Sequence, residues 1–174
     1  PETRPQARET AQAESVSETF RGYRKVLVDH GYLAFLAIGL IVNVVYMQMY
    51  STLSVYLRDV HGVPTQAYGA LMSANAALVV LAQFWVSRRV KPYPPLPMMA
   101  LGSALYMIGF TMFGLVSAYV LFLAAMLTIT IGEMIVIPVG QALVARFAPD
   151  DMRGRYMAIF GVVWAVPAAI GPWA

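Results

Sequence analysis

The sequence alternates between long apolar runs and short polar segments. The apolar runs cover residues 33–57, 66–86, 96–115, 118–144 and 156–174. An α-helix rises about 1.5 Å per residue, so about 20 apolar residues cross the hydrocarbon core of a bilayer. The pattern therefore predicts an all-α membrane protein, a polytopic helical bundle of five spans, the last of which is incomplete.

The composition supports a membrane protein and excludes several other classes. Hydrophobic residues make up 59% of the chain and charged residues 12%, against about 45–50% and about 25% in soluble domains. The chain has no cysteine, and His30 and His61 lie in separate polar segments, so we expect no metal site. No Gly-rich phosphate loop is present. We expect no cofactor and no enzyme activity.

Residues 1–32 differ from the remainder of the chain. The first 20 are polar and of mixed charge, which indicates a flexible linker, and residues 21–32 are basic and amphipathic, which predicts a short surface helix. The chain begins without Met, and it ends inside an apolar run. We therefore expect a linker, 1–32, and a transmembrane unit, 33–174, that are parts of a longer protein.

Lysine and arginine alternate between the loops and set the expected orientation. Three lie in 21–25, one in the turn 58–65, three in 87–95, none in 116–118 and three in 145–155. Cytoplasmic loops carry the excess of these residues, so the linker and the loops 87–95 and 145–155 are predicted to be cytoplasmic. The basic residues form no single patch, which argues against a nucleic-acid partner. The candidate cytoplasmic gate or topology residues are Arg88, Arg89, Arg146, Arg153 and Arg155.

Glu133 is the one charged residue well inside an apolar run. It lies about 22 Å along the fourth span, where a carboxylate is costly and should face a cavity or a partner. A proton carrier needs such a group, which gains a proton in one state and loses it in another. The alternative is a structural hydrogen bond to a neighbouring helix.

Two prolines fall inside predicted spans. Pro138 and Pro167 cannot donate to the carbonyl groups of Met134 and Val163, so we expect each to kink its helix. Broken helices at a polar site are common in transporters, but proline is also tolerated in membrane helices generally.

Uncharged polar and aromatic residues recur along the first two spans. Several in the first span are spaced three or four apart and so share a helix face. They are candidates to line a cavity for an amphipathic solute, whereas hydrogen bonding between helices is the alternative for each residue alone. The candidates are Asn43, Tyr46, Met47, Tyr50, Asn75 and Gln83.

Two groups of segments resemble a known family. Residues 46–50 (YMQMY), 55–57, 68–75 (YGALMSAN) and 79–83 resemble spans seven and eight of the major facilitator superfamily. Residues 132–142 (GEMIVIPVGQA) and 148–157 (APDDMRGRYM) are typical of spans ten and eleven in its bacterial drug-efflux-like proton antiporters. In place of the Gly-rich motif with an Asp that often follows span eight, this chain has Ser87-Arg88-Arg89-Val90-Lys91, so no gate charge pair is expected there.

The resemblance implies half of a twelve-helix fold, spans seven to eleven, in a bacterial inner membrane. Residues 1–32 would then join two six-helix halves, with the substrate between the halves and alternating access by rocking. Glu133 matches the membrane acid of span ten, and Arg153 and Arg155 match cytoplasmic arginines of the ten-to-eleven loop. The implied partners are a small-molecule substrate, protons, the lipid bilayer and the N-terminal half.

The resulting hypothesis is proton-coupled export of hydrophobic or amphipathic small molecules. Alternatives are an importer of another solute class, a membrane-embedded enzyme, and a receptor or assembly protein on the same scaffold. An enzyme would need a second acid, a His or a metal pair at the depth of Glu133, and the sequence offers none.

Overall fold

The structure is a computed structural model that describes residues 16–170. In this range all regular secondary structure is α-helical, which confirms the predicted fold class. The helices are α1 (Val16–Val26), α2 (His30–Met47), α3 (Leu53–His61), α4 (Thr65–Val90), α5 (Pro95–Leu115), α6 (Tyr119–Phe147), α7 (Arg153–Phe160) and α8 (Val162–Ile170).

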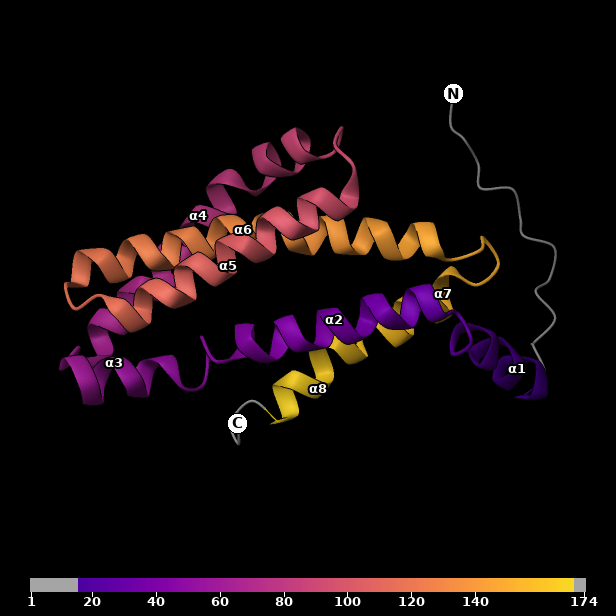
Figure 1. Cartoon of the computed structure of the whole chain (residues 1–174), viewed down its shortest axis with the longest axis horizontal. Helices are drawn as coiled ribbons and strands as arrows, with labels where there is room; N and C mark the ends of the chain where they lie inside the picture. The colour runs from indigo at the N-terminus through magenta and orange to yellow at the C-terminus, as the bar shows by residue number, and fades with distance from the viewer. Residues whose placement is uncertain (1–15, 171–174) are drawn as a thin grey trace, which may run out of the picture.

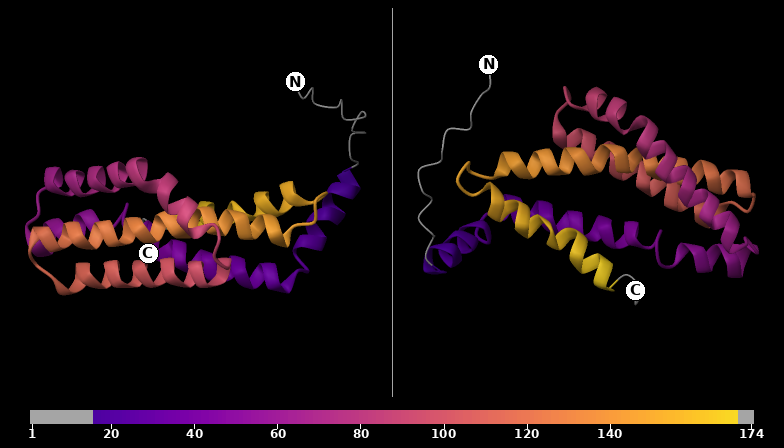
Figure 2. Two further views of the ribbon diagram at one scale, coloured as in Figure 1. Left: turned by 90° about the horizontal axis from the view of Figure 1, so that it is seen from above. Right: turned by 180° about the vertical axis from the view of Figure 1, so that it is seen from behind.

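The helices form two layers (Figures 1 and 2). One layer holds α4, α5 and α6, with α6 packed against both of the others. The second layer holds α2, α3, α7 and α8, and α2 packs against α8. The first helix, α1, lies at the end of the bundle where α2 and α7 begin.

The helix ends follow from local sequence. The Asp29 carboxylate accepts a hydrogen bond from the Tyr32 N–H, which caps the start of α2. Pro95 occupies the first turn of α5, where a missing N–H costs little. At the end of α3, Gly62 adopts φ 66°, a left-handed conformation that favours glycine and terminates the helix.

Glycines bring α5 and α6 into close contact. A Cβ atom added to Gly102 would lie 2.5 Å from Val136 Cγ2, and one added to Gly132 would lie 2.8 Å from the Gly102 carbonyl oxygen. Gly109 faces Ile129 of α6 in the same way. Membrane helices associate through such small residues, because lipid supplies no hydrophobic force between helices.

The first predicted span, 33–57, is divided between α2 and α3, with turns at residues 48–52. The Leu53 N–H bonds to the Gln48 carbonyl five residues earlier, and the Ser51 hydroxyl bonds to the Met47 carbonyl at 3.2 Å. The five-residue spacing of the Leu53 bond departs from the four-residue spacing of an α-helix and marks the interruption. The Tyr68 hydroxyl of α4 donates to the Met49 carbonyl at the break.

The prolines leave helices continuous on both sides of them. Pro138 lies inside α6, which runs unbroken from Tyr119 to Phe147. Pro167 lies inside α8, and the interruption in the predicted fifth span falls at Gly161, between α7 and α8. Residues 171–174 of that span, and residues 1–15 of the predicted linker, lie outside the described residues.

Buried side chains form two clusters at opposite ends of the bundle. The α7-end cluster joins α1, α2, α6 and α7, and the larger α3-end cluster joins α2, α3, α4, α5 and α6. The α7-end cluster consists of Val26, Tyr32, Val144, Ala148, Met152 and Tyr156. The α3-end cluster consists of Tyr46, Met49, Leu53, Leu57, Val63, Leu71, Tyr106, Phe113, Phe122, Ala125, Met126 and Ile129.

Four described helices, α2, α4, α5 and α6, are long and apolar enough to cross a membrane. Most of their surface is not covered by the chain itself: 44% of the most apolar stretch of α6 is buried, but only 11% of that of α4. In water so much exposed apolar surface would be unfavourable, so it faces lipid or other membrane helices.

Candidate functional site

Glu133 lies on α6 at the interface with α4. The side chain is half-buried, and its Oε2 accepts a hydrogen bond from Asn75 Nδ2 of α4 at 3.1 Å. The acid predicted from its place in an apolar run therefore meets a polar partner on a neighbouring helix, as a carboxylate inside a membrane requires.

Asn75 and Thr130 extend this contact into a short chain of hydrogen bonds. Asn75 Nδ2 donates to Thr130 Oγ1 at 2.8 Å, and the Thr130 hydroxyl donates to the Met126 carbonyl at 2.8 Å. Both side chains are buried. An amide nitrogen carries two hydrogens and a hydroxyl both donates and accepts, so these bonds are mutually compatible. Asn75, predicted to line a substrate cavity, thus bridges α4 and α6.

Gln83 makes a second polar bridge between the same helices. Its Nε2 donates to the Met134 carbonyl of α6 at 3.1 Å and to Ser87 Oγ at 2.9 Å. Asn75 and Gln83 are eight residues apart, which places them on one face of α4. The α4–α6 interface is therefore held by two amide side chains.

Aromatic rings gather around Tyr46 beside the acid. The Tyr46 ring lies 5.4 Å from Tyr106 of α5 and 6.2 Å from Trp164 of α8, and its hydroxyl is 3.2 Å from that of Tyr50. Tyr46 and Tyr106 are close enough to Glu133 to interact with it electrostatically. The hydroxyls of the predicted pair Tyr46 and Tyr50 do meet, although Tyr50 lies in the turns after α2 rather than on its face. Neither Tyr106 nor Trp164 was among the predicted cavity residues. A tyrosine inside an apolar run was the available signal for Tyr106.

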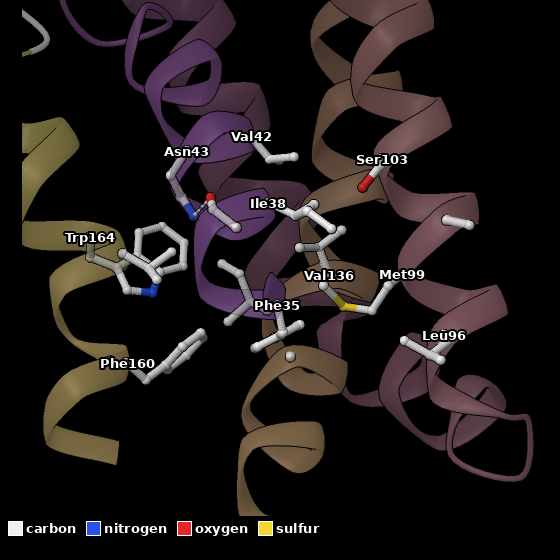
Figure 3. Close-up of a pocket in the computed structure, with 15 residues that line it drawn as sticks. Phe35, Ile38, Val42, Asn43, Leu96, Met99, Ser103, Val136, Phe160 and Trp164 are labelled. Atoms are coloured by element: carbon white, nitrogen blue, oxygen red, sulfur yellow. Dashed lines mark hydrogen bonds between the residues drawn. The ribbon is translucent and has the colours of Figure 1, made fainter. Parts of the chain in front are cut away.

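A mainly apolar cavity of about 360 Å³ lies between the two buried clusters (Figure 3). Phe160 and Trp164 reach into it from α7 and α8, opposite Leu96 and Met99 of α5. Asn43 also lines it, with its Nδ2 bonded to the Gly39 carbonyl at 3.0 Å within α2. Of the six predicted cavity residues only Asn43 belongs to this lining.

Met47 and Tyr50 complete the predicted set. Met47 packs against the α3-end cluster, and Tyr50 is half-exposed at the break between α2 and α3. Glu133 is not among the lining residues of this cavity, although Val136 and Ile137, one turn further along α6, are.

The predicted basic residues all lie near helix ends. Arg88 and Arg89 are in the last turn of α4, with the Arg88 guanidinium 5.9 Å from the centre of the Phe84 ring. Arg146 is in the last turn of α6. Arg153 begins α7 and pairs with Asp150 at 2.9 Å in an exposed salt bridge, which contributes little stability.

Arg155 contacts α1 and adjoins a polar network that sequence analysis missed. Its guanidinium lies over Gly22, where an added Cβ would approach Arg155 Nε to 2.5 Å. The Tyr32 hydroxyl donates to the Tyr156 carbonyl at 2.6 Å, and the Tyr156 hydroxyl donates to Asp29 Oδ2 at 2.9 Å. These contacts fix the start of α2 against α7.

In residues 16–170 no three His, Cys, Asp or Glu side chains gather as a metal site would need. The arrangement instead places one half-buried carboxylate next to amide, hydroxyl and aromatic groups. Such a group can exchange a proton, and the same carboxylate can attract a cation.

These features define a multi-pass α-helical integral membrane protein. The chain belongs to the major facilitator superfamily, a family of secondary transporters, whose family model matches residues 1–172. It is 23% identical over 87% of its length to the "Na(+), Li(+), K(+)/H(+) antiporter" of Planococcus maritimus. It is 30% identical over 73% of its length to the MFS-type transporter YttB of Bacillus subtilis, and 28% identical over 84% to YdeE of Escherichia coli. The chain spans 39%, 32% and 38% of those three relatives.

Proposed function

We propose that this chain is the C-terminal half of a proton-coupled transporter that exports hydrophobic or amphipathic small molecules by alternating access, with Glu133 carrying the proton. The observation that supports this most is the hydrogen bond from Asn75 of α4 to the Glu133 carboxylate. It places the single acid of the described membrane helices at a contact between two of them, where a change of charge affects helix packing.

An amide is a suitable partner for a group that gains and loses a proton. Asn75 donates through Nδ2 to a charged carboxylate, and after rotation its carbonyl oxygen accepts from a protonated one. Thr130 can follow this exchange, because a hydroxyl both donates and accepts. Proton uptake would thus change which group donates and which accepts between α4 and α6.

The aromatic cluster supports an amphipathic or cationic substrate. Tyr106 and Trp164 both lie against the Tyr46 ring, and aromatic faces attract organic cations. Such a substrate and a proton would compete for the negative charge of Glu133, and this competition is the basis of exchange.

The proposed orientation places α1 and the loops 87–95 and 145–155 in the cytoplasm. Its support is the excess of lysine and arginine in these segments. The natural chain has no cysteine, so a cysteine substituted for Lys91 should react with an impermeant thiol reagent only from the cytoplasmic side.

The test is transport by the intact protein in proteoliposomes with an imposed pH gradient. In vesicles with the natural protein, addition of tetraphenylphosphonium should drive a proton flux across the membrane that dissipates the pH gradient. Glu133→Gln should lower this proton flux about 100-fold or more while leaving the protein folded. Asp59→Asn is the matched control, because Asp59 is exposed and pairs with its neighbour Arg58, at 2.7 Å. Normal proton-coupled flux by Glu133→Gln would refute the coupling role.

A second candidate cargo is a monovalent metal cation, which the name of the Planococcus maritimus relative favours. The same vesicles can be given Na⁺, K⁺ or Li⁺ in place of the organic cation. Dissipation of the pH gradient by these ions alone would identify cation/proton antiport. Glu133→Gln should abolish that flux as well, since the carboxylate is then the site that ion and proton share.

A further inference from the structure

The first helix, α1, packs against the bundle through the face that carries Gly22 and Val26. Gly22 and Val26 are buried, and Gly22 allows the Arg155 side chain of α7 to lie directly on the helix. Val26 belongs to the α7-end cluster. This face fixes α1 in place and leaves its other faces open.

The open surface of α1 is divided into an apolar and a basic part. Phe20 of α1 and Leu27, the residue directly after its end, are 71% and 56% exposed, and the half-buried Tyr23 lies between them at helical spacing. The basic part carries the exposed side chains of Arg21, Arg24 and Lys25. A helix with these two surfaces is suited to the boundary between lipid headgroups and acyl chains.

The position of α1 agrees with that boundary. Only Leu27, Val28 and Asp29 separate it from α2, a helix long enough to span the membrane. Figures 1 and 2 show α1 at the end of the bundle, turned away from the direction of α2. It therefore lies where a membrane span emerges from the bilayer.

An apolar groove runs from α1 along the membrane helices. It has a volume of about 430 Å³, begins at Tyr23 and Leu27, and continues between α2 and α7–α8 past Leu36 and Leu40. No charged side chain lines it. The groove thus joins the basic surface of α1 to the apolar surface of the spans.

We propose that this surface binds an anionic phospholipid. The phosphate-bearing headgroup pairs with Arg21, Arg24 and Lys25, and one acyl chain occupies the groove between α2 and α7–α8. A lipid suits the site because it alone combines an anionic group with a long apolar chain on the side of the membrane span. The inference does not depend on Glu133 or on transport.

The headgroup contact can be tested with the intact protein in nanodiscs that contain equal amounts of phosphatidylglycerol and phosphatidylcholine. Native mass spectrometry after extraction counts the lipids retained. The natural protein should retain phosphatidylglycerol preferentially, and the triple variant Arg21→Gln, Arg24→Gln, Lys25→Gln should retain at least five times less.

The matched control removes the same three charges elsewhere, as Arg88→Gln, Arg89→Gln, Lys91→Gln at the end of α4. It should retain phosphatidylglycerol as the natural protein does. An equal loss in both triple variants would mean general attraction to the bilayer and would overturn a specific site. Absence of any retained lipid on the natural protein would overturn it too, and would indicate that another protein segment covers the groove.

The acyl-chain contact needs a second variant. Ala37→Trp places a large ring in the groove, from a position that lines it and is exposed on α2. Retention of phosphatidylglycerol should fall at least threefold although all three basic residues remain. Unchanged retention would refute occupation of the groove. Circular dichroism melts of every variant establish that it is folded, so loss of lipid is distinguished from loss of structure.

Discussion

The helix α6 meets its two neighbours in different ways. Toward α5 the backbones approach so closely that Gly102 and Gly132 have no space for a side chain. Toward α4 the contact depends on the amides of Asn75 and Gln83. Both kinds of contact stabilise helix association inside the membrane, where burying apolar surface contributes little free energy. Close packing permits one geometry, whereas hydrogen bonds can exchange partners, so in our proposal α5–α6 is the fixed interface and α4–α6 the one that responds to protonation.

The largest effect is expected from filling the close contact. Gly109→Leu would push a side chain against Ile129 and against the Ala125 carbonyl, which lies 2.9 Å from the added Cβ. We expect a loss of about 3 kcal/mol in the free energy of unfolding, measured by denaturant titration in detergent. Gly114→Leu is the matched control on the same helix, since no atom lies within 4 Å of its added Cβ. Equal stability of the two variants would show that α5 and α6 are not held by close packing.

A smaller loss of stability, with a larger loss of function, is expected at the polar interface. Asn75→Leu removes the hydrogen bonds to Glu133 and Thr130, and should cost about 1 kcal/mol of stability. Proton-coupled flux should fall about tenfold, because the acid loses its partner on α4.

Gln83→Leu provides the comparison for that variant. It removes the bonds to Met134 and Ser87 and should lower stability to a similar extent, yet leave flux within about twofold of normal. Equal proton-coupled flux in the two variants would show that Asn75 stabilises helix packing but does not affect the function of Glu133.

The smallest effect is expected from the hydroxyl that supports Asn75. Thr130→Val keeps the shape of the side chain but removes the acceptor, and should cost about 0.6 kcal/mol. Thr128 makes the same backbone bond, to the Ala124 carbonyl at 2.8 Å, but that bond is exposed and Thr128 is only partly buried. Thr128→Val should therefore be nearly neutral in thermal melts, and a larger loss there than at Thr130 would argue against the bridge from Asn75.

The sequence predicted the helices better than the contacts between them. Three apolar runs, 66–86, 96–115 and 118–144, coincide closely with α4, α5 and α6 because hydrophobic length is a local property. The turns at 48–52 were not predicted, since they lie inside an apolar run and contain no proline or glycine.

The candidate site was predicted in part. Glu133 stood out because a charge within hydrocarbon is costly, and that argument needs no knowledge of its neighbours. The bond from Asn75 joins residues 58 positions apart, so only the packing of α4 on α6 reveals it. The same holds for Tyr106 and Trp164, and for the glycines of α5, whose role depends on the helix they face.

The most direct test of the central claim counts protons released when a substrate binds. Binding and proton affinity are reciprocally linked, so a substrate that competes with a proton at Glu133 must displace it. Addition of tetraphenylphosphonium or Na⁺ to the purified intact protein in weakly buffered detergent should release about one proton per molecule, and none from Glu133→Gln. Equal proton release from the natural protein and the variant would contradict the account.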